Sequence, residues 1–153
     1  MSDNIMPLSG VRVIDFTQVM LGPCATQMLG DFGADVIKIE RTGFGDLSRN
    51  FFGETSEEAM NNAVFASLNR NKRSVEINTK SEEGRAAVLE LIKTADVVVD
   101  NFRAGVMERL GFGYDDLAKI NPGIICASGT GFGPVGPYAH KGGQDVLAQA
   151  MTG

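Results

Sequence analysis

The first forty residues carry the pattern that most constrains the fold of this chain. Val11–Thr17 and Asp35–Glu40 are short, β-branched runs, which is typical of buried strands. Between them, apolar residues recur at helical spacing, and we expect a helix with Pro23 in its first position and a stop at Gly33. A strand, a helix and a strand in this order form a β-α-β unit, whose two strands are almost always parallel.

The same alternation continues along the rest of the chain. Strands are expected at residues 74–79, 96–100 and 123–128, and helices at 81–95, 105–110, 114–120 and 144–151. Ser81, followed by two glutamates, suits the start of the first of these helices. Residues 41–66 are rich in Gly, Ser, Asn and Asp and predict a long irregular loop. The pattern predicts an α/β fold: a Rossmann-like, mainly parallel sheet with helices on both faces, formed by one segment over residues 1–153.

Composition narrows the classes of partner and compartment. The chain has 153 residues, enough for one core without disulfides, and Cys24 and Cys126 lie in apolar surroundings without a CxxC pair. We therefore expect two buried thiols in a reducing compartment. No signal segment or apolar run of membrane-spanning length occurs, which predicts a soluble, cytoplasmic protein. With 14 basic and 19 acidic residues, nucleic acid and anionic membranes are disfavoured as partners.

Ligands of parallel sheets bind beyond the carboxyl ends of the strands. The expected strand ends and the loops after them carry several cations and one amide, a set that suits a ligand with several phosphates: Arg41, Lys80, Asn101, Arg103, Arg109 and Lys141. A second basic cluster, Arg70, Lys72 and Arg73, could hold a phosphate, but a solvated face is the favoured interpretation.

Other familiar sites fit the sequence poorly. Residues 131–136 match GxGxxG, but the prolines and glycines that follow delay any helix, which disfavours a nicotinamide or flavin site. His140 is the only histidine and has no acidic or thiol partner at ligand spacing, so no metal site is expected. The chain has no G-x-S-x-G elbow, and one histidine near the end gives no Ser-His-Asp order. Hydrolase chemistry is therefore disfavoured.

Several motifs, in one order, carry a family resemblance over essentially the whole chain. They are Leu8-Ser-Gly-Val-Arg-Val-Ile-Asp-Phe-Thr17, Gly22-Pro23, the run from Leu29 to Arg41, Asn71-Lys-Arg-Ser74, the run from Ala95 to Gly105, Leu110-Gly111, Asn121-Pro122 and the run from Gly143 to Gly153. With these motifs the chain resembles the N-terminal part of the class III CoA-transferases. That family includes formyl-CoA:oxalate CoA-transferase, carnitine CoA-transferase and α-methylacyl-CoA racemase.

The resemblance implies that coenzyme A is the phosphorylated ligand and is bound as a substrate, without a tightly bound cofactor. Carried over from the formyl-CoA transferase pattern, Arg41 would contact the adenine end, while Ile77, Asn78, Thr79 and Lys80 would line the nucleotide pocket. Asn101, Phe102 and Arg103 would lie along the coenzyme, and Arg109 and Lys141 would meet its phosphates.

The same pattern places three residues at the reaction centre. Met20 and Leu21 stand where the formyl-CoA transferase has a glutamine and an alanine that face the thioester. Met20 cannot donate the glutamine's hydrogen bond, which speaks against a formyl or oxalate substrate. Gln144 stands where the racemases carry a catalytic histidine, and an amide cannot take a proton there. The transferase is therefore favoured over the racemase alternative.

The family's transferases use an aspartate nucleophile, and the resemblance implies that it lies beyond residue 153. Asp145 belongs to an earlier helix start, where we expect it to cap. Relatives are far longer, with a second domain, a chain that returns to the first, and an interlocked homodimer. The expected function is thus that of the N-terminal portion of an acyl-CoA:carboxylate CoA-transferase. A racemase-like enzyme and a non-catalytic, inactive CoA-binding fragment are the alternatives.

Overall fold

The computed structural model describes residues 5–50 and 63–153. It contains a five-stranded sheet whose strand order is β3-β2-β1-β4-β5, with every neighbouring pair parallel. The strands are β1 (Arg12–Asp15), β2 (Asp35–Glu40), β3 (Lys72–Glu76), β4 (Val97–Asp100) and β5 (Ile125–Ser128). The expectation of an α/β fold with a parallel sheet is confirmed.

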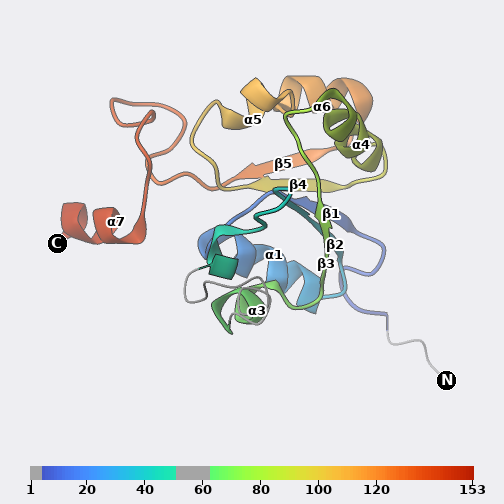
Figure 1. The fold of residues 1–153 in the computed structure, drawn as a ribbon, viewed down its shortest axis with the longest axis horizontal. Coiled ribbons are helices and arrows are strands. Elements are labelled where there is room, and N and C mark those ends of the chain that lie inside the picture. Colours follow the sequence, from blue (N-terminus) through green and yellow to red (C-terminus); the bar gives the residue numbers. More distant parts are fainter. Residues whose placement is uncertain (1–4, 51–62) are drawn as a thin grey trace.

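Helices cover both faces of this sheet (Figure 1). One face carries α1 (Leu21–Asp31) and α3 (Ala63–Asn69), and the other carries α4 (Glu82–Ile92), α5 (Val106–Leu110) and α6 (Tyr114–Ile120). A short 3-10 helix, η1 (Leu47–Asn50), follows β2. The last helix, α7 (Asp145–Thr152), stands apart from the sheet at the end of a long loop (Figure 1). None of the helices in residues 5–50 and 63–153 is long and apolar enough to cross a bilayer.

The two faces of the sheet differ in chemistry because side chains alternate along each strand. On the side of α4 and α6, the larger apolar core includes Ile14, Ile37 and Val98, packed with Val88 and Leu117. On the side of α1, the apolar cluster around Val13 and Val36 is small, and the alternate positions of β1 and β2 that follow toward their carboxyl ends are charged: Asp15, Lys38 and Glu40 are all at most 2% exposed. The α1 side of the central strands is therefore a buried polar layer.

Most expected elements are present, with shifted ends. Ser81 caps α4 as predicted, and its Oγ accepts a hydrogen bond from the Gly84 amide at 3.1 Å. The strand expected at 74–79 begins two residues earlier and ends three residues earlier, because Lys72 pairs with Val36 and its ammonium is anchored by Asp15. Helix α1 begins at Leu21, so Pro23 stands third, still in the first turn where its missing N–H costs nothing.

The expectation of an irregular loop over residues 41–66 is wrong where η1 and α3 lie, and residues 51–62 fall outside the described ones. Ala, Leu and Ser in Ala63–Asn69 are compatible with a helix, a signal that the preceding polar residues concealed. The prediction that both cysteines are buried is also wrong. Cys24 is half-buried, and Cys126 is exposed because β5 is an edge strand whose four residues are all exposed.

Candidate functional site

The carboxyl ends of four parallel strands meet around one cavity of about 510 Å³. Gln18 follows β1, Arg41 and Thr42 follow β2, and Phe102 follows β4. The end of β3 joins them because the Ile77 amide continues the ladder to the Glu40 carbonyl at 2.9 Å. The lining residues are Phe16, Gln18, Ile39, Glu40, Arg41, Thr42, Ile77, Asn78, Thr79, Lys80, Phe102, Val106 and Leu110.

This cavity, which we call the edge cavity, combines an apolar wall with two cations, Arg41 and Lys80. Phe16, Ile39 and Phe102 contribute apolar surface. The side chains of Arg41 and Lys80 form no ion pair with any carboxylate in the described part of the chain, and Arg41 lies 5.6 Å from the ring of Phe44. Apolar walls with a few fixed charges suit a ligand that has a flat apolar group beside anionic groups.

The distribution of ion pairs across the molecule sets these cations apart. Eight of the 14 Lys and Arg residues pair with carboxylates of the described residues. The six that do not are Arg41, Lys80, Arg85, Arg103, Arg109 and Lys141. Five of these six are the cations that the sequence predicted to meet an anionic ligand. The chain therefore leaves its unpaired positive charge largely at the predicted positions.

Four of the residues predicted to bind coenzyme A do not line the edge cavity: Asn101, Arg103, Arg109 and Lys141. The side-chain amide of Asn101 is bonded to the backbone of Gln18: its oxygen accepts from the Gln18 N–H, and its nitrogen donates to the Gln18 carbonyl, both at 2.8 Å. Arg103 lines a second, smaller cavity of about 250 Å³ between α5 and β5, where burial is the main cause that raises the pKa of Asp100. Arg109 is exposed on α5, and the Lys141 ammonium lies over the Tyr138 ring, 4.1 Å from its centre.

The residues predicted for the reaction centre are exposed. Met20 is 58% exposed and precedes α1, and Leu21, at 69%, is the first residue of that helix. Gln144 precedes α7 and is also exposed. The predicted capping role of Asp145 is wrong, because Gln144 holds the cap position and the Asp145 carboxylate instead accepts a hydrogen bond from Gln149, one turn later, at 2.7 Å.

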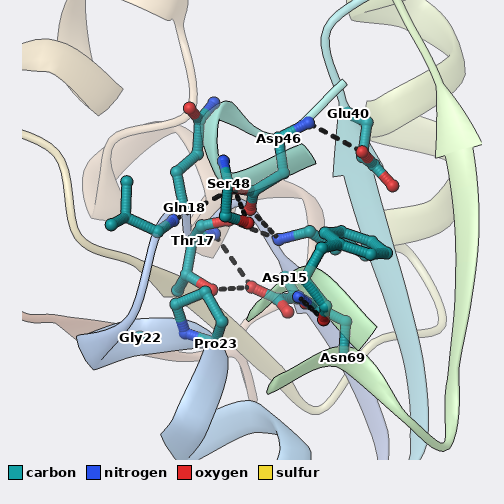
Figure 2. A network of polar contacts seen from close by, with 12 residues as sticks. Asp15, Thr17, Gln18, Gly22, Pro23, Glu40, Asp46, Ser48 and Asn69 are labelled. Atoms are coloured by element: carbon teal, nitrogen blue, oxygen red, sulfur yellow. Dashed lines mark hydrogen bonds and ion pairs between the residues drawn. The ribbon is translucent and has the colours of Figure 1, made fainter. Parts of the chain in front are cut away.

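On the α1 side of the sheet, the polar layer forms a buried network (Figure 2). The Asp15 carboxylate accepts from the Thr17 amide at 2.8 Å, from Thr26 Oγ1 at 2.7 Å and from Lys72 Nζ at 3.0 Å. Lys72 Nζ also donates to the carbonyl of Pro23 and to the side chain of Asn69. Burial lowers the pKa of Lys72, although Asp15 opposes this effect.

A second part of the network joins β2 to η1. Lys38 Nζ lies 2.8 Å from Asp46 Oδ2, and these side chains are 1% and 0% exposed. Glu40 accepts two hydrogen bonds from Arg49, each 2.7 Å long. Burial favours the neutral form of both carboxyls, but Lys38 beside Asp46, and Arg49 and Ser74 beside Glu40, outweigh it and lower both pKa values.

This network was missed by sequence reasoning. The interpretation of Arg70, Lys72 and Arg73 as a solvated face is wrong for Lys72, whose side chain is 2% exposed, while Arg70 and Arg73 are exposed and paired with Asp31 and Asp35. The available signal was the alternation of Lys38 and Glu40 with isoleucines in β2. Such alternation is equally typical of a half-exposed strand, so it did not reveal burial.

The GxGxxG loop at residues 131–136 does not have the structure of a dinucleotide-binding loop. Gly131 and Gly143 meet backbone to backbone, and α7 begins only at Asp145, so the motif does not open a helix as a dinucleotide fingerprint would. Among the described residues, no group of three or more His, Cys, Asp or Glu side chains could hold a metal ion.

A family model and two curated relatives that match this chain all describe CoA-transferases. The family model described as CoA-transferase family III matches residues 8–153. The chain is 47% identical to an acetyl-CoA:oxalate CoA-transferase of Acetobacter aceti over 96% of its length, and 45% identical to a succinyl-CoA:glutarate CoA-transferase of Mus musculus over 99%. It covers 37% and 34% of those proteins, so it spans about one third of these relatives.

A solved structure agrees with this result. A CAIB/BAIF family protein from Brucella suis superposes with a TM-score of 0.87 at 40% identity, and the match covers 97% of this chain and 39% of that one.

Proposed function

The chain belongs to CoA-transferase family III, and from this premise we propose that its edge cavity binds the coenzyme A part of an acyl-CoA. The observation that carries the proposal is the edge cavity itself: it joins Arg41, Lys80, Ile77 and Phe102 around a space of about 510 Å³, within the usual range for small-molecule sites. The apolar wall would take the adenine ring, and the two cations, which have no carboxylate partner in the described residues, would meet phosphates.

We propose that the complete protein transfers CoA between two carboxylic acids. The named relatives support this class, since each pairs an acyl-CoA with a dicarboxylate, oxalate or glutarate. Met20, an apolar residue at the edge of the sheet, would favour an acyl group that needs no hydrogen bond from that position.

For the mechanism we propose covalent catalysis by an aspartate in polypeptide that follows residue 153. Its carboxylate would attack the thioester carbonyl, and CoA would leave as the thiolate, giving a mixed anhydride. The thiolate would then attack the aspartyl carbonyl and expel the donor acid, leaving an aspartyl-CoA thioester. The acceptor carboxylate would reverse these two steps and leave with CoA. Asp145 is a poor nucleophile candidate, because its carboxylate is bonded to Gln149 on a helix without buried residues.

The remaining parts of the proposal concern assembly and location. We propose a cytoplasmic, interlocked homodimer in which residues 1–153 form the CoA-binding segment and a second domain supplies the nucleophile. The apolar side chains of Val146, Leu147 and Met151 are 43–66% exposed, and coverage by further polypeptide would account for them. CoA would act as a substrate, with no tightly bound cofactor.

The proposal is tested with the complete protein and a panel of acyl-CoAs. We expect intact-mass spectrometry to detect a CoA-sized adduct that hydroxylamine removes, together with CoA transfer to an added carboxylate. Racemisation of a 2-methylacyl-CoA without an adduct would instead identify the racemase alternative. Binding of CoA without either reaction would identify a non-catalytic CoA-binding protein.

A further inference from the structure

Val19, between β1 and α1, has a backbone conformation that valine rarely adopts. Its φ is +70°, in the left-handed region, and among the described residues Asn71 is the one other non-glycine with a positive φ. A β-branched side chain is a genuine outlier in this region, whereas asparagine is tolerated there. Strain of this kind persists only where the surroundings impose it.

The surroundings that impose it are buried side chains. The Val19 N–H donates to Asp46 Oδ1 at 3.1 Å, and the same oxygen accepts from the amide and hydroxyl of Ser48 at 2.8 and 2.7 Å. The other oxygen of Asp46 lies 2.8 Å from Lys38 Nζ, which also donates to the Thr17 carbonyl at 2.6 Å. One fully buried ion pair thus contacts the backbone on both sides of Gln18.

The backbone of Gln18 is held by the side-chain amide of Asn101 through two hydrogen bonds. A side chain at Gly22 would collide with Thr17, so the start of α1 lies directly against the end of β1. The backbone from Thr17 to Val19 is therefore fixed by side chains from β2, from the turn before η1 and from the end of β4. This fixed backbone leads directly into the exposed side chains of Met20 and Leu21.

We propose that Asp46 is a positioning residue: oriented by Lys38, it holds Val19 in the left-handed conformation and thereby sets where Met20 and Leu21 stand at the acyl end of the site. This inference rests on the proposed function for the role of Met20 and Leu21, but the backbone clamp can be measured without any activity. Asp46 does not line the edge cavity and would act on the substrate only through this segment.

The first test compares Val19→Gly with Val19→Ala in the complete protein. Val19→Ala removes the two γ-methyl groups and Val19→Gly removes the whole side chain, but only glycine adopts positive φ without steric cost. We expect Val19→Gly to melt at a higher temperature than Val19→Ala. The opposite order, which is usual at ordinary backbone positions, would overturn the proposal. Hydrogen exchange at the Val19 amide should be slow in the wild type, and exchange at an unprotected rate would also overturn it.

The second test separates positioning from stability. Asp46→Asn keeps an oxygen for the Val19 N–H but loses the ion pair, whereas Asp46→Ala loses both. We expect both variants to melt earlier, and kcat for CoA transfer to fall by roughly 10- to 100-fold only in Asp46→Ala, with a smaller change in KM. Adding Val19→Gly to Asp46→Ala should recover part of kcat while the melting temperature stays low, because glycine no longer needs the clamp.

The outcomes distinguish this proposal from the proposed function. If the wild type binds and transfers no CoA, the proposed function fails, and the Val19 pair and the amide exchange still decide whether the clamp exists. If the wild type transfers CoA but Asp46→Ala keeps its kcat, or Val19→Gly rescues nothing, the positioning role fails while the transferase stands. If Asp46→Ala does not fold, the Val19→Gly and Val19→Ala pair and the exchange of the Val19 amide decide whether the clamp exists, and a fall of 10-fold or more in the kcat of Asp46→Asn, which keeps the Val19 contact, would contradict the positioning role.

Discussion

The buried network and the edge cavity differ in whether their positively charged side chains are paired with carboxylates. In the buried network, Lys38 and Lys72 each contact a carboxylate and are at most 2% exposed in their side chains. In the edge cavity, Arg41 and Lys80 are exposed and have no carboxylate partner in the described residues. Glu40 and Arg41 show the contrast at adjacent positions: Glu40 is bound by Arg49, while Arg41 faces the edge cavity.

The contrast separates charges that hold the fold from charges that are available to a ligand. A charge taken out of water is costly unless it is paired, so the network's lysines and carboxylates depend on one another. An exposed cation costs little to keep, and without a local carboxylate it keeps its full attraction for phosphate. The two regions should therefore respond differently to the loss of a single charge.

The largest effect is expected from Lys38→Met in the complete protein. This substitution leaves the Asp46 carboxylate buried without its partner, and breaking such a pair costs about 3–5 kcal/mol. Denaturant unfolding measures the loss, and Lys119→Met, which removes an exposed helical pair on α6, is the control. Equal stability of the two variants would contradict the distinction between the regions.

Arg41→Ala and Lys80→Ala test the other region. Each should weaken CoA binding by about 1–3 kcal/mol, the range for loss of a charge-assisted hydrogen bond, without changing the melting temperature. Arg85→Ala is the matched control, since Arg85 is also exposed and has no carboxylate partner among the described residues, yet lines neither cavity. Titration calorimetry with CoA would contradict the proposed site if the three variants bound alike.

Ser81→Ala tests whether stability and CoA binding depend on different residues at two adjacent positions, Lys80 and Ser81. Ser81 caps α4, and loss of a cap of this kind costs about 1 kcal/mol of stability. We expect a lower melting temperature with nearly unchanged CoA affinity, the reverse of Lys80→Ala. A loss of affinity as large as that of Lys80→Ala would show that the two positions cannot be separated in this way.

The smallest effect is expected for Arg73→Ala. Arg73 bonds Asp35 at 2.6 Å, but its side chain is 64% exposed, and exposed pairs contribute about 0–1 kcal/mol. The effect on unfolding should shrink further at high salt because surface charges are screened. A loss of unfolding free energy as large as that of Lys38→Met would contradict the expectation that exposure decides how much an ion pair stabilises the fold.

The fold was largely predictable from the sequence, because hydrophobic periodicity and the residues that begin or end helices and strands are local features. The β-α-β pattern, the Ser81 cap and the strand at Asp35–Glu40 need no knowledge of distant contacts. The start of β3 could not be predicted locally, since it depends on Lys72 reaching Asp15, 57 positions earlier in the chain. The exposure of Cys126 depends likewise on β5 standing at the edge of the sheet.

The site was predictable in part. Arg41, Ile77–Lys80 and Phe102 surround one cavity, as residues after neighbouring parallel strands should. The different surroundings of Lys38 and Lys80 were not predictable, because they depend on contacts between distant parts of the chain. Lys38 pairs with Asp46, whereas Lys80 has no carboxylate partner among residues 5–50 and 63–153. The left-handed Val19 had no sequence signal, because valine is among the residues least expected there.

Lysine acetylation of the complete protein, with and without a saturating CoA analogue that lacks the thiol, tests the central claim most directly. We expect the analogue to protect Lys80 strongly. Lys93, exposed directly after α4, and Lys119, exposed on α6, lie outside both cavities and should react equally in both samples. Lys80 reactivity that is unchanged by the analogue would contradict the assignment of the edge cavity to coenzyme A.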